Sequence, residues 1–238
     1  MARFADKLAL VTGASRGIGR AVAKVLAREG AHVILAARRE GSLEDVDDEI
    51  RSLGGSATLV KLDVTAGDKV DALGPTIYER WGKLDILVAN AGILGPLSPL
   101  HHISDDAWDN VMAINLTANW RLIRTLDPLL RHANAGRAVF VSSGASAAKN
   151  AYWGPYAASK AGLEALVKTY AHEIATTNVR ANIINPGPVR TEMRQQAFPG
   201  EDPMTLPTPE DIAEQFLDVV DPACVDNGRV FSLDKRTK

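Results

Sequence analysis

The sequence is poor in several features, and each scarcity narrows the possible functions. Its single cysteine, Cys224, cannot form an internal disulfide, and the apolar run near the N-terminus is too short for a signal peptide. The 27 Lys and Arg residues balance 29 Asp and Glu without a block of one sign, which argues against a nucleic-acid or membrane-surface partner. No apolar stretch approaches the length of a membrane span. We therefore expect a cytoplasmic protein whose partners are small molecules or its own copies.

Short, nearly continuous apolar runs recur along the chain, and segments with helical spacing lie between them. Such runs are typical of strands buried on both faces of a sheet. The runs cover residues 8–12, 33–37, 58–62, 84–89, 138–142, 179–184 and 229–233, and the clearest helical segments cover 18–28, 108–132 and 156–175. This alternation predicts an α/β fold, with one parallel sheet covered by helices on both faces, in a single domain spanning residues 1–238.

The segment 190–209 fits neither element. It holds four prolines and the acidic pair Glu201-Asp202. Long loops in compact domains often close over a binding site, so we expect a substrate lid here.

A glycine-rich turn follows the first predicted strand and opens an amphipathic segment. Glycines let the backbone turn sharply, and the N–H groups and dipole at a helix start favour a pyrophosphate. A purely structural turn is the alternative reading. The residues predicted to hold a dinucleotide are Gly13, Ser15, Arg16, Gly17, Ile18 and Gly19.

The end of the second predicted strand bears on the choice of cofactor. An acidic residue there would bind the ribose diol of NAD, but this chain has Ala37 followed by Arg38 and Arg39. Arg38, together with Arg16, can hold a 2′-phosphate through charge-assisted hydrogen bonds, which favours NADP(H) over NAD(H). A solvated arginine pair is the alternative, and it suits Arg39 better than Arg38.

Several short motifs occur together in a characteristic order. They are TGASRGIG at 12–19, LDV at 62–64, NAG at 90–92, Asn115, Ser143, Tyr156-x-x-x-Lys160 and NPGPVRT at 185–191. In this order and spacing they resemble the short-chain dehydrogenase/reductase family. The stretch Thr191-Glu192-Met193-Arg194, with FPGEDP at 198–203 and TPEDIA at 208–213, is similar to a little-characterised bacterial subgroup of oxidoreductases. The resemblance implies a three-layer Rossmann-type sheet of about seven strands, a nicotinamide cofactor, and hydride transfer between an alcohol and a carbonyl.

Tyr156 and Lys160 would lie one turn apart on one face of a helix. A free tyrosine has a pKa of about 10, and a neighbouring cation lowers it. Lys160 would thus make Tyr156 a usable general acid or base. Ser143 would donate a second hydrogen bond to the substrate oxygen that receives the Tyr156 proton. We prefer Ser143 for this role over the nearby Ser142 and Ser146. By resemblance Asn115 holds a water that relays protons to Lys160, although from sequence it could equally be a polar contact inside a helix.

The resemblance also implies further cofactor contacts. Asp63 and Val64 would lie beside the adenine, and Asn90, Ala91 and Gly92 would line the riboses. Tyr156 and Lys160 would also face the cofactor. The nicotinamide would meet a loop that contains Pro186, Gly187, Val189 and Thr191, with Thr191 bonded to the carboxamide.

The substrate pocket is predicted to be apolar with a few charges at its rim. Its candidates are Ile93, Leu94, Trp153, Met193 and Phe198, with Arg194 at the rim, and Phe198 could equally be ordinary packing. The adjacent histidines His101 and His102 have no Cys or acidic partners at ligand spacing, so no metal site is predicted.

The chain ends in a basic tail after Ser232-Leu233-Asp234, where the family commonly has a Gly-Gly pair. This difference puts the family's usual homotetramer in doubt and leaves a homodimer through the helices of Trp120 and Leu163.

The main hypothesis is an NADP(H)-dependent oxidoreductase. The alternatives are an NAD-dependent alcohol dehydrogenase and a dinucleotide-binding sensor or scaffold without turnover.

Overall fold

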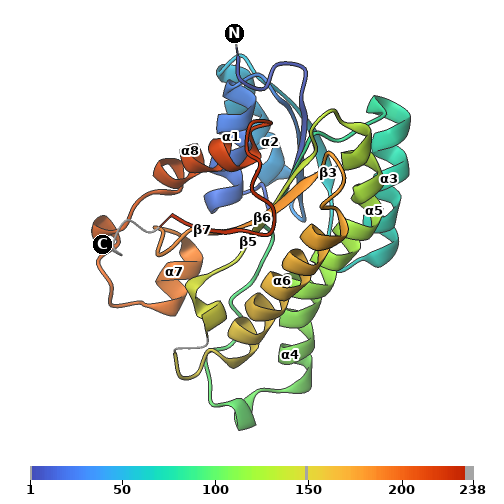
Figure 1. Cartoon of the computed structure of the whole chain (residues 1–238). Coiled ribbons are helices and arrows are strands. Elements are labelled where there is room, and N and C mark those ends of the chain that lie inside the picture. The colour runs from blue at the N-terminus through green and yellow to red at the C-terminus, as the bar shows by residue number, and fades with distance from the viewer. Residues whose placement is uncertain (1, 148–149, 234–238) are drawn as a thin grey trace.

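A seven-stranded parallel sheet forms the centre of the molecule (Figure 1). The computed structural model describes residues 2–147 and 150–233. The strand order is β3-β2-β1-β4-β5-β6-β7, so the chain first builds outward from β1 and then returns to add β4 on the other side. This confirms the predicted Rossmann-type, doubly wound α/β fold. The strands are β1 (Leu8–Thr12), β2 (His32–Ala37), β3 (Ser56–Lys61), β4 (Ile86–Ala89), β5 (Arg137–Val141), β6 (Arg180–Asn185) and β7 (Val230–Ser232).

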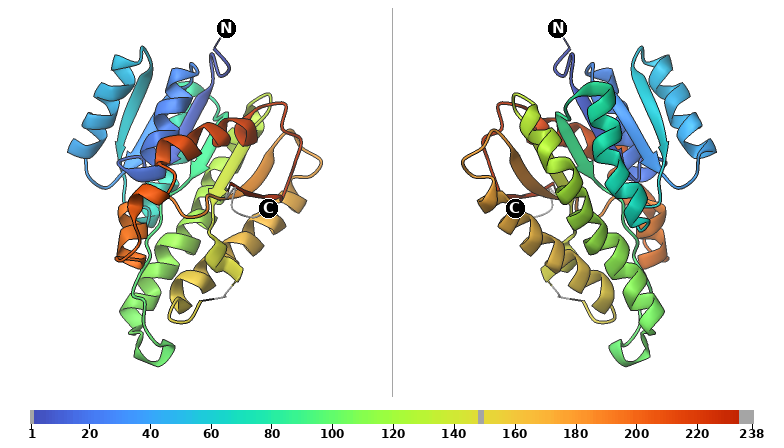
Figure 2. Two further views of the ribbon diagram at one scale, coloured as in Figure 1. Left: turned by 90° about the vertical axis from the view of Figure 1, so that its left-hand side faces the viewer. Right: turned by 90° about the vertical axis from the view of Figure 1, so that its right-hand side faces the viewer.

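Helices cover both faces because alternate residues of each strand point to opposite sides. In β1, Ala9 and Val11 belong to one core, whereas Leu8 and Leu10 belong to the other. The two views of Figure 2 show the two helical layers. The first core includes residues of α1 (Gly17–Arg28), α2 (Gly41–Ser52) and α8 (Pro209–Val220), and the second includes residues of α3 (Gly67–Trp81), α5 (Ala118–His132) and α6 (Gly154–Glu173).

The helix predicted over 108–132 is interrupted. It begins as α4 (Asp105–Met112), passes through a π turn at Ala113–Thr117 and continues as α5. A π turn accommodates one extra residue and often lies at a functional site. Here it contains Asn115, whose side chain is fully buried.

The predicted lid is partly helical. Segment 190–209 contains α7 (Glu192–Ala197) and a 3-10 turn at Pro203–Thr205 before α8 begins. The α7 helix forms because Thr191 caps it, accepting a hydrogen bond from the Arg194 amide at 3.2 Å. The prolines lie outside α7, so they do not prevent it. That this segment moves as a lid stays a prediction.

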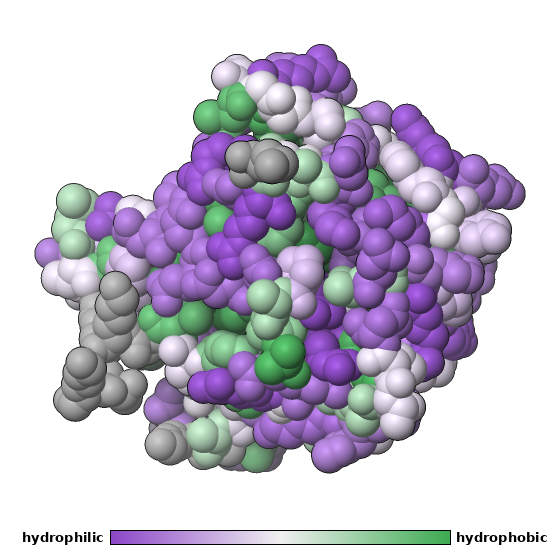
Figure 3. Space-filling model, turned by 45° about the horizontal axis from the view of Figure 1, so that its top comes forward, coloured by the Kyte–Doolittle hydropathy of each residue, from purple (hydrophilic) through white to green (hydrophobic). Residues whose placement is uncertain are grey.

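Hydrophilic residues cover most of the face shown in Figure 3. None of the helices in the described part of the chain combines the length and apolar character that a membrane span requires. Of the two residues that marked the predicted dimer helices, Trp120 is 44% exposed on α5, whereas Leu163 is fully buried within its own subunit. The basic tail, residues 234–238, lies outside the described residues.

Candidate active site

A cavity of about 800 Å³ opens at the carboxyl ends of the central strands. Ligands bind at this edge of doubly wound sheets, near the point where strand order reverses. It brings together most of the predicted site residues, which come from distant parts of the chain. They are Gly13, Ser15, Arg16, Gly17, Ile18, Arg38, Asp63, Val64, Asn90, Ala91, Gly92, Ser143, Tyr156, Lys160, Pro186, Gly187, Val189 and Thr191. Gly19 and Asn115 are not among the lining residues.

The glycines of the turn after β1 have different roles. Gly13 has φ +66°, and a Cβ there would lie 2.9 Å from the Asn90 side chain. At Gly17 an added Cβ would make only an ordinary contact, 3.6 Å from a Thr191 methyl carbon, so there the positive φ of +56° and not lack of space favours glycine. A Cβ on Gly19 would lie 2.4 Å from the Gly13 carbonyl oxygen. The structure thus places Gly19 behind the turn, where it allows close packing, rather than in the cavity.

The start of α1 fits an anionic group. Arg16 occupies the N-cap position in an extended conformation, its side chain does not cap the helix, and the first turn contains no acidic residue. The first N–H groups of a helix lack intrahelical partners and lie at the positive end of the helix dipole. These groups fit the pyrophosphate of a dinucleotide.

Thr12 and Asn90 fix the glycine turn to the end of β4 through hydrogen bonds. The Thr12 hydroxyl accepts hydrogen bonds from the amides of Asn90 at 3.0 Å and Ala91 at 3.1 Å. The Asn90 side chain donates to the carbonyl oxygens of Thr12 at 3.0 Å and Gly13 at 3.3 Å. Asn90 therefore holds β1 and β4 together at the cavity edge. Thr12, which begins the glycine motif, was not predicted as a site residue, and its signal was its position at the end of a buried strand.

The end of β2 supplies the cations expected for a 2′-phosphate. Arg38 and Arg39 both line the cavity and are exposed. Asp63, on the neighbouring turn after β3, accepts hydrogen bonds from the Thr65 amide at 2.9 Å and hydroxyl at 2.8 Å. These bonds, followed by the charge of Arg38, hold the pKa of Asp63 below its usual value. Its carboxylate is thus ionised and fixed beside the cations.

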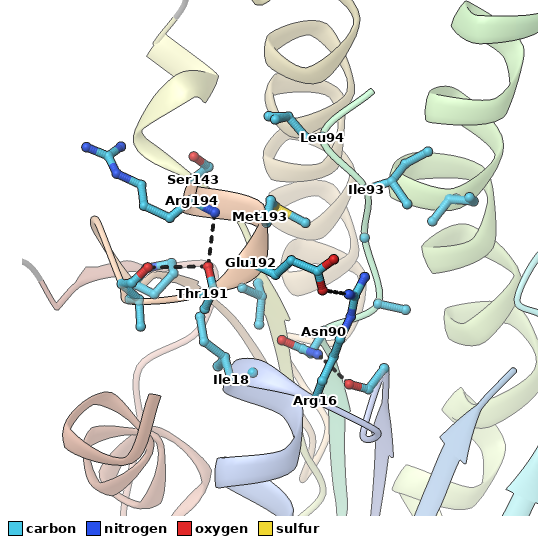
Figure 4. Close-up of a pocket in the computed structure, with 18 of the residues that line it drawn as sticks. Arg16, Ile18, Asn90, Ile93, Leu94, Ser143, Thr191, Glu192, Met193 and Arg194 are labelled. Carbon is cyan, nitrogen blue, oxygen red and sulfur yellow. Dashed lines mark hydrogen bonds and ion pairs between the residues drawn. The ribbon is translucent and has the colours of Figure 1, made fainter. Parts of the chain in front are cut away.

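An ion pair crosses the cavity mouth between the glycine turn and α7. Arg16 donates to the carboxylate of Glu192, and Figure 4 shows the two side chains pointing toward one another. Both side chains are more than half exposed. Sequence reasoning missed Glu192, because 176 residues separate it from Arg16. Only the fold places the two side chains together.

Tyr156 and Lys160 lie on α6 at the floor of the cavity, and both are buried. Burial raises the pKa of Tyr156, whereas the nearby Ser143 hydroxyl lowers it. Burial also lowers the pKa of Lys160 to about 8. Its amine donates to the Val141 carbonyl oxygen at 2.8 Å and lies 5.8 Å from the centre of the Tyr156 ring. We expected Lys160 to lower the pKa of Tyr156, but in this structure desolvation dominates and raises it.

Asn115 acts through the backbone of its neighbours. Its side-chain oxygen accepts from the Ile93 amide at 2.9 Å, and its nitrogen donates to the Ile93 carbonyl oxygen at 2.9 Å and the Ser159 hydroxyl at 3.1 Å. These bonds fix the irregular segment that follows β4. The observed geometry corresponds to the polar-contact alternative, and the water relay through Asn115 stays a prediction.

The loop after β6 forms the opposite wall. Gly187 has φ +70°, and its amide donates to the Asn185 side chain at 3.1 Å. The Thr191 hydroxyl, predicted to bond a carboxamide, donates to the Val189 carbonyl oxygen at 3.3 Å and also caps α7 (Figure 4). Its first role is therefore to begin this helix.

The predicted substrate residues gather at the other end of the cavity. Ile93, Leu94, Trp153, Met193 and Arg194 line it. Phe198 is not a lining residue, and it contacts Trp153 with a centroid distance of 5.7 Å. Over residues 2–147 and 150–233, no group of three His, Cys, Asp or Glu side chains is arranged to hold a metal ion.

Comparisons with known proteins agree with this arrangement. A family model described as short chain dehydrogenase matches residues 7–202. The chain is 40% identical over 215 residues to the uncharacterized oxidoreductase YciK of Escherichia coli strain K12, covering 89% of this chain and 85% of that protein. The protein therefore belongs to the short chain dehydrogenase family of oxidoreductases.

Solved structures of short chain dehydrogenases are also similar to this chain. A short chain dehydrogenase of Pseudomonas syringae superposes with a TM-score of 0.94 at 38% identity, covering 98% of this chain and 96% of that one. A short chain dehydrogenase of Shigella flexneri complexed with NADP superposes with a TM-score of 0.93 at 38% identity, covering 98% of each chain.

Proposed function

We propose that this protein is an NADP(H)-dependent oxidoreductase that interconverts a carbonyl compound and a secondary alcohol, with Tyr156 as the general acid or base. The observation that carries the proposal is that one cavity contains the glycine turn, Arg38, the partly buried Ser143, and the buried pair Tyr156 and Lys160. The NADP bound to the similar Shigella flexneri protein supports the choice of cofactor.

The residues of the cavity fit such a cofactor. The open start of α1 would hold the pyrophosphate, and Arg38, with Arg16 released from Glu192, would hold the 2′-phosphate. The loop of Gly187 and Val189 would face the nicotinamide. When bound, NADPH supplies the hydride for carbonyl reduction.

The protein groups would manage the proton and the oxygen charge. Because burial raises the pKa of Tyr156, its phenol stays protonated at neutral pH and can donate to the carbonyl oxygen. The Ser143 hydroxyl would donate a second hydrogen bond to the same oxygen as negative charge develops. Once the phenol has lost its proton, the charged amine of Lys160, close to the ring, would stabilise the phenolate.

A Tyr156→Phe variant tests this proposal. We expect kcat for NADPH-dependent carbonyl reduction to fall by about 10²–10⁴-fold, the usual contribution of a general acid, while NADPH still binds. Tyr170→Phe is the matched control: Tyr170 is also a buried tyrosine of α6, and it donates to Asp127 outside the cavity. Wild-type turnover by Tyr156→Phe would refute the catalytic assignment. Tighter binding of NADH than NADPH would favour the NAD-dependent alternative, and binding without turnover on any carbonyl would favour a sensor.

A further inference from the structure

The substrate end of the cavity is built from apolar side chains that belong to neither main core. Leu94, Ala145 and Tyr156 are buried there, and four partly buried residues pack around them. These four are Leu97, Trp153, Met193 and Ala197. Leu94 comes from the segment after β4, Trp153 from the start of α6 and Met193 from α7, so three elements enclose one chamber.

Aromatic rings form one wall of this chamber beside the candidate proton donor. The Trp153 ring lies 5.8 Å from the Tyr156 ring at an interplanar angle of 67°. The Phe198 ring, which does not line the cavity, lies 5.7 Å from the Trp153 ring at an interplanar angle of 37°. Trp153 and Tyr156 both line the cavity and belong to one apolar cluster, so a substituent of a carbonyl held by the Tyr156 hydroxyl would have the Trp153 ring close by. Aromatic rings pack favourably against one another in edge-to-face or offset arrangements, so a planar ring suits this wall.

The cation at the rim is already engaged. The Arg194 guanidinium makes two hydrogen bonds to the carboxylate of Glu201, at 2.6 and 2.8 Å, and lies 3.8 Å from the centre of the Phe198 ring. Both charged side chains are about one-quarter exposed. In Figure 4 the Arg194 side chain leads away from Met193 and Leu94. This two-point pair uses Nε and one Nη of Arg194 and neutralises its charge, so a second anion would bind it less strongly.

The neighbouring charged groups are also engaged. Arg190 donates to the carbonyl oxygens of Pro203 at 2.7 Å and Leu206 at 3.1 Å. Glu192 pairs with Arg16 at the cofactor end. The amine of Lys160 also lines the cavity, but it is buried and donates to the Val141 carbonyl oxygen. Within the described residues, a substrate carboxylate in the chamber would therefore meet mainly apolar surface and the already paired Arg194. Burying an unpaired carboxylate is costly.

We propose that the preferred substrates are uncharged ketones or aldehydes with a planar ring beside the carbonyl, and that the Arg194–Glu201 pair excludes their carboxylate-bearing analogues. This substrate class rests on the proposed function. In the reduction, hydride adds to the carbonyl carbon and the Tyr156 proton to its oxygen, which gives the secondary or primary alcohol and oxidised cofactor. Glu201 acts as a specificity-determining residue by occupying Arg194.

The test compares two ketones of the same ring, acetophenone and phenylglyoxylate, in NADPH-consumption assays. For the wild-type protein we expect kcat/KM to be at least about tenfold higher with acetophenone, since an unmet hydrogen bond to a charged group costs about 1.5–3 kcal/mol. Glu201→Gln removes the competing charge, so the ratio should shift toward phenylglyoxylate by about tenfold. Adding Arg194→Met to that variant should abolish the shift.

The control is Glu214→Gln, which makes the same change in an Arg–Glu pair outside the cavity, between Glu214 on α8 and Arg28 at the end of α1. It should leave the ratio unchanged. A wild-type preference for phenylglyoxylate, or an unchanged ratio in Glu201→Gln that still binds NADPH, would overturn the substrate class. So would Tyr156-dependent reduction of other carbonyls without any reduction of acetophenone. If the protein reduces no carbonyl compound at all, the proposed function is overturned, and this inference with it.

Discussion

Buried charges at the amino ends of the strands (the amino edge of the sheet) differ in their bonding from the buried charge at the carboxyl ends (the carboxyl edge). At the amino edge, Asp85 is 1% exposed and accepts hydrogen bonds from the Leu8 amide at 3.0 Å and the Lys7 amine at 3.1 Å, and it also pairs with Lys83. At the carboxyl edge, Lys160 is 4% exposed and donates to one carbonyl oxygen, with no acidic partner in the described part of the chain. The first charge is satisfied within the protein, and the second is not.

Arg137, at the amino end of β5, follows the amino-edge pattern. It is 5% exposed, and its guanidinium donates to four backbone carbonyl oxygens, those of Gly136, Asn178, Asp221 and Pro222. Asp85 and Arg137, two buried charges far from the cavity, are thus well bonded within the protein. An incompletely satisfied charge beside a cavity reduces stability, and such strain is typical of functional sites.

The largest expected effect is at Lys160. Lys160→Met should lower kcat by about 10²–10⁴-fold and raise the free energy of unfolding near pH 7 by about 1–3 kcal/mol. Because burial lowers the pKa from 10.5 to about 8, the unfolded chain binds the proton more tightly. The charged amine therefore destabilises the fold below about pH 8, and this cost disappears as the pH rises toward 10.5. Urea unfolding of the wild type and the variant at pH 7 and pH 10 measures this destabilisation. A variant that is less stable than the wild type at pH 7 would contradict the prediction.

Asp85→Asn should show the opposite combination. Removing one partner of a buried pair commonly costs 3–5 kcal/mol, but Lys7 and Lys83 reach solvent, so we expect a loss of about 2–3 kcal/mol. Since Asp85 lies at the far edge of the sheet, kcat of the folded protein should not change. Urea unfolding and steady-state kinetics on the same preparation test both parts, and a marked fall in kcat would refute the separation of the two edges.

Arg38→Ala tests the cofactor end of the cavity. We expect NADPH affinity to fall by about 10–100-fold through loss of charge-assisted bonds to the 2′-phosphate, with NADH affinity unchanged. Fluorescence titration with each cofactor measures this, and Arg39→Ala is the matched control for a general loss of positive charge. An equal loss for both cofactors would argue against a 2′-phosphate contact.

Glu192→Gln should have the smallest effect. Exposed ion pairs contribute about 0–1 kcal/mol, so releasing Arg16 should raise NADPH affinity by about two- to fivefold. Titration at low and high salt checks this, because the gain should shrink when salt screens the pair. Weaker NADPH binding would mean that Glu192 supports the site and does not compete for Arg16.

The fold could be predicted largely from local patterns. Strands buried on both faces are continuously apolar, and a glycine turn before an amphipathic segment marks the start of α1, so the sheet and its first crossover follow from short stretches of sequence. The helix α7 was missed because proline density pointed to a loop, while the Thr191 cap that starts the helix is a single-residue signal. The π turn at Asn115 was missed because periodicity does not reveal one extra residue.

The sequence by itself determined the class of fold, the family, and which residue types surround the cavity, because these depend on short motifs and on apolar periodicity. Tertiary structure decided how those residues are used. It paired Arg16 with Glu192 and Arg194 with Glu201, placed Gly19 behind the turn, and raised the pKa of Tyr156. The physical reason is that partner choice and desolvation depend on distances between segments that only the folded chain brings together.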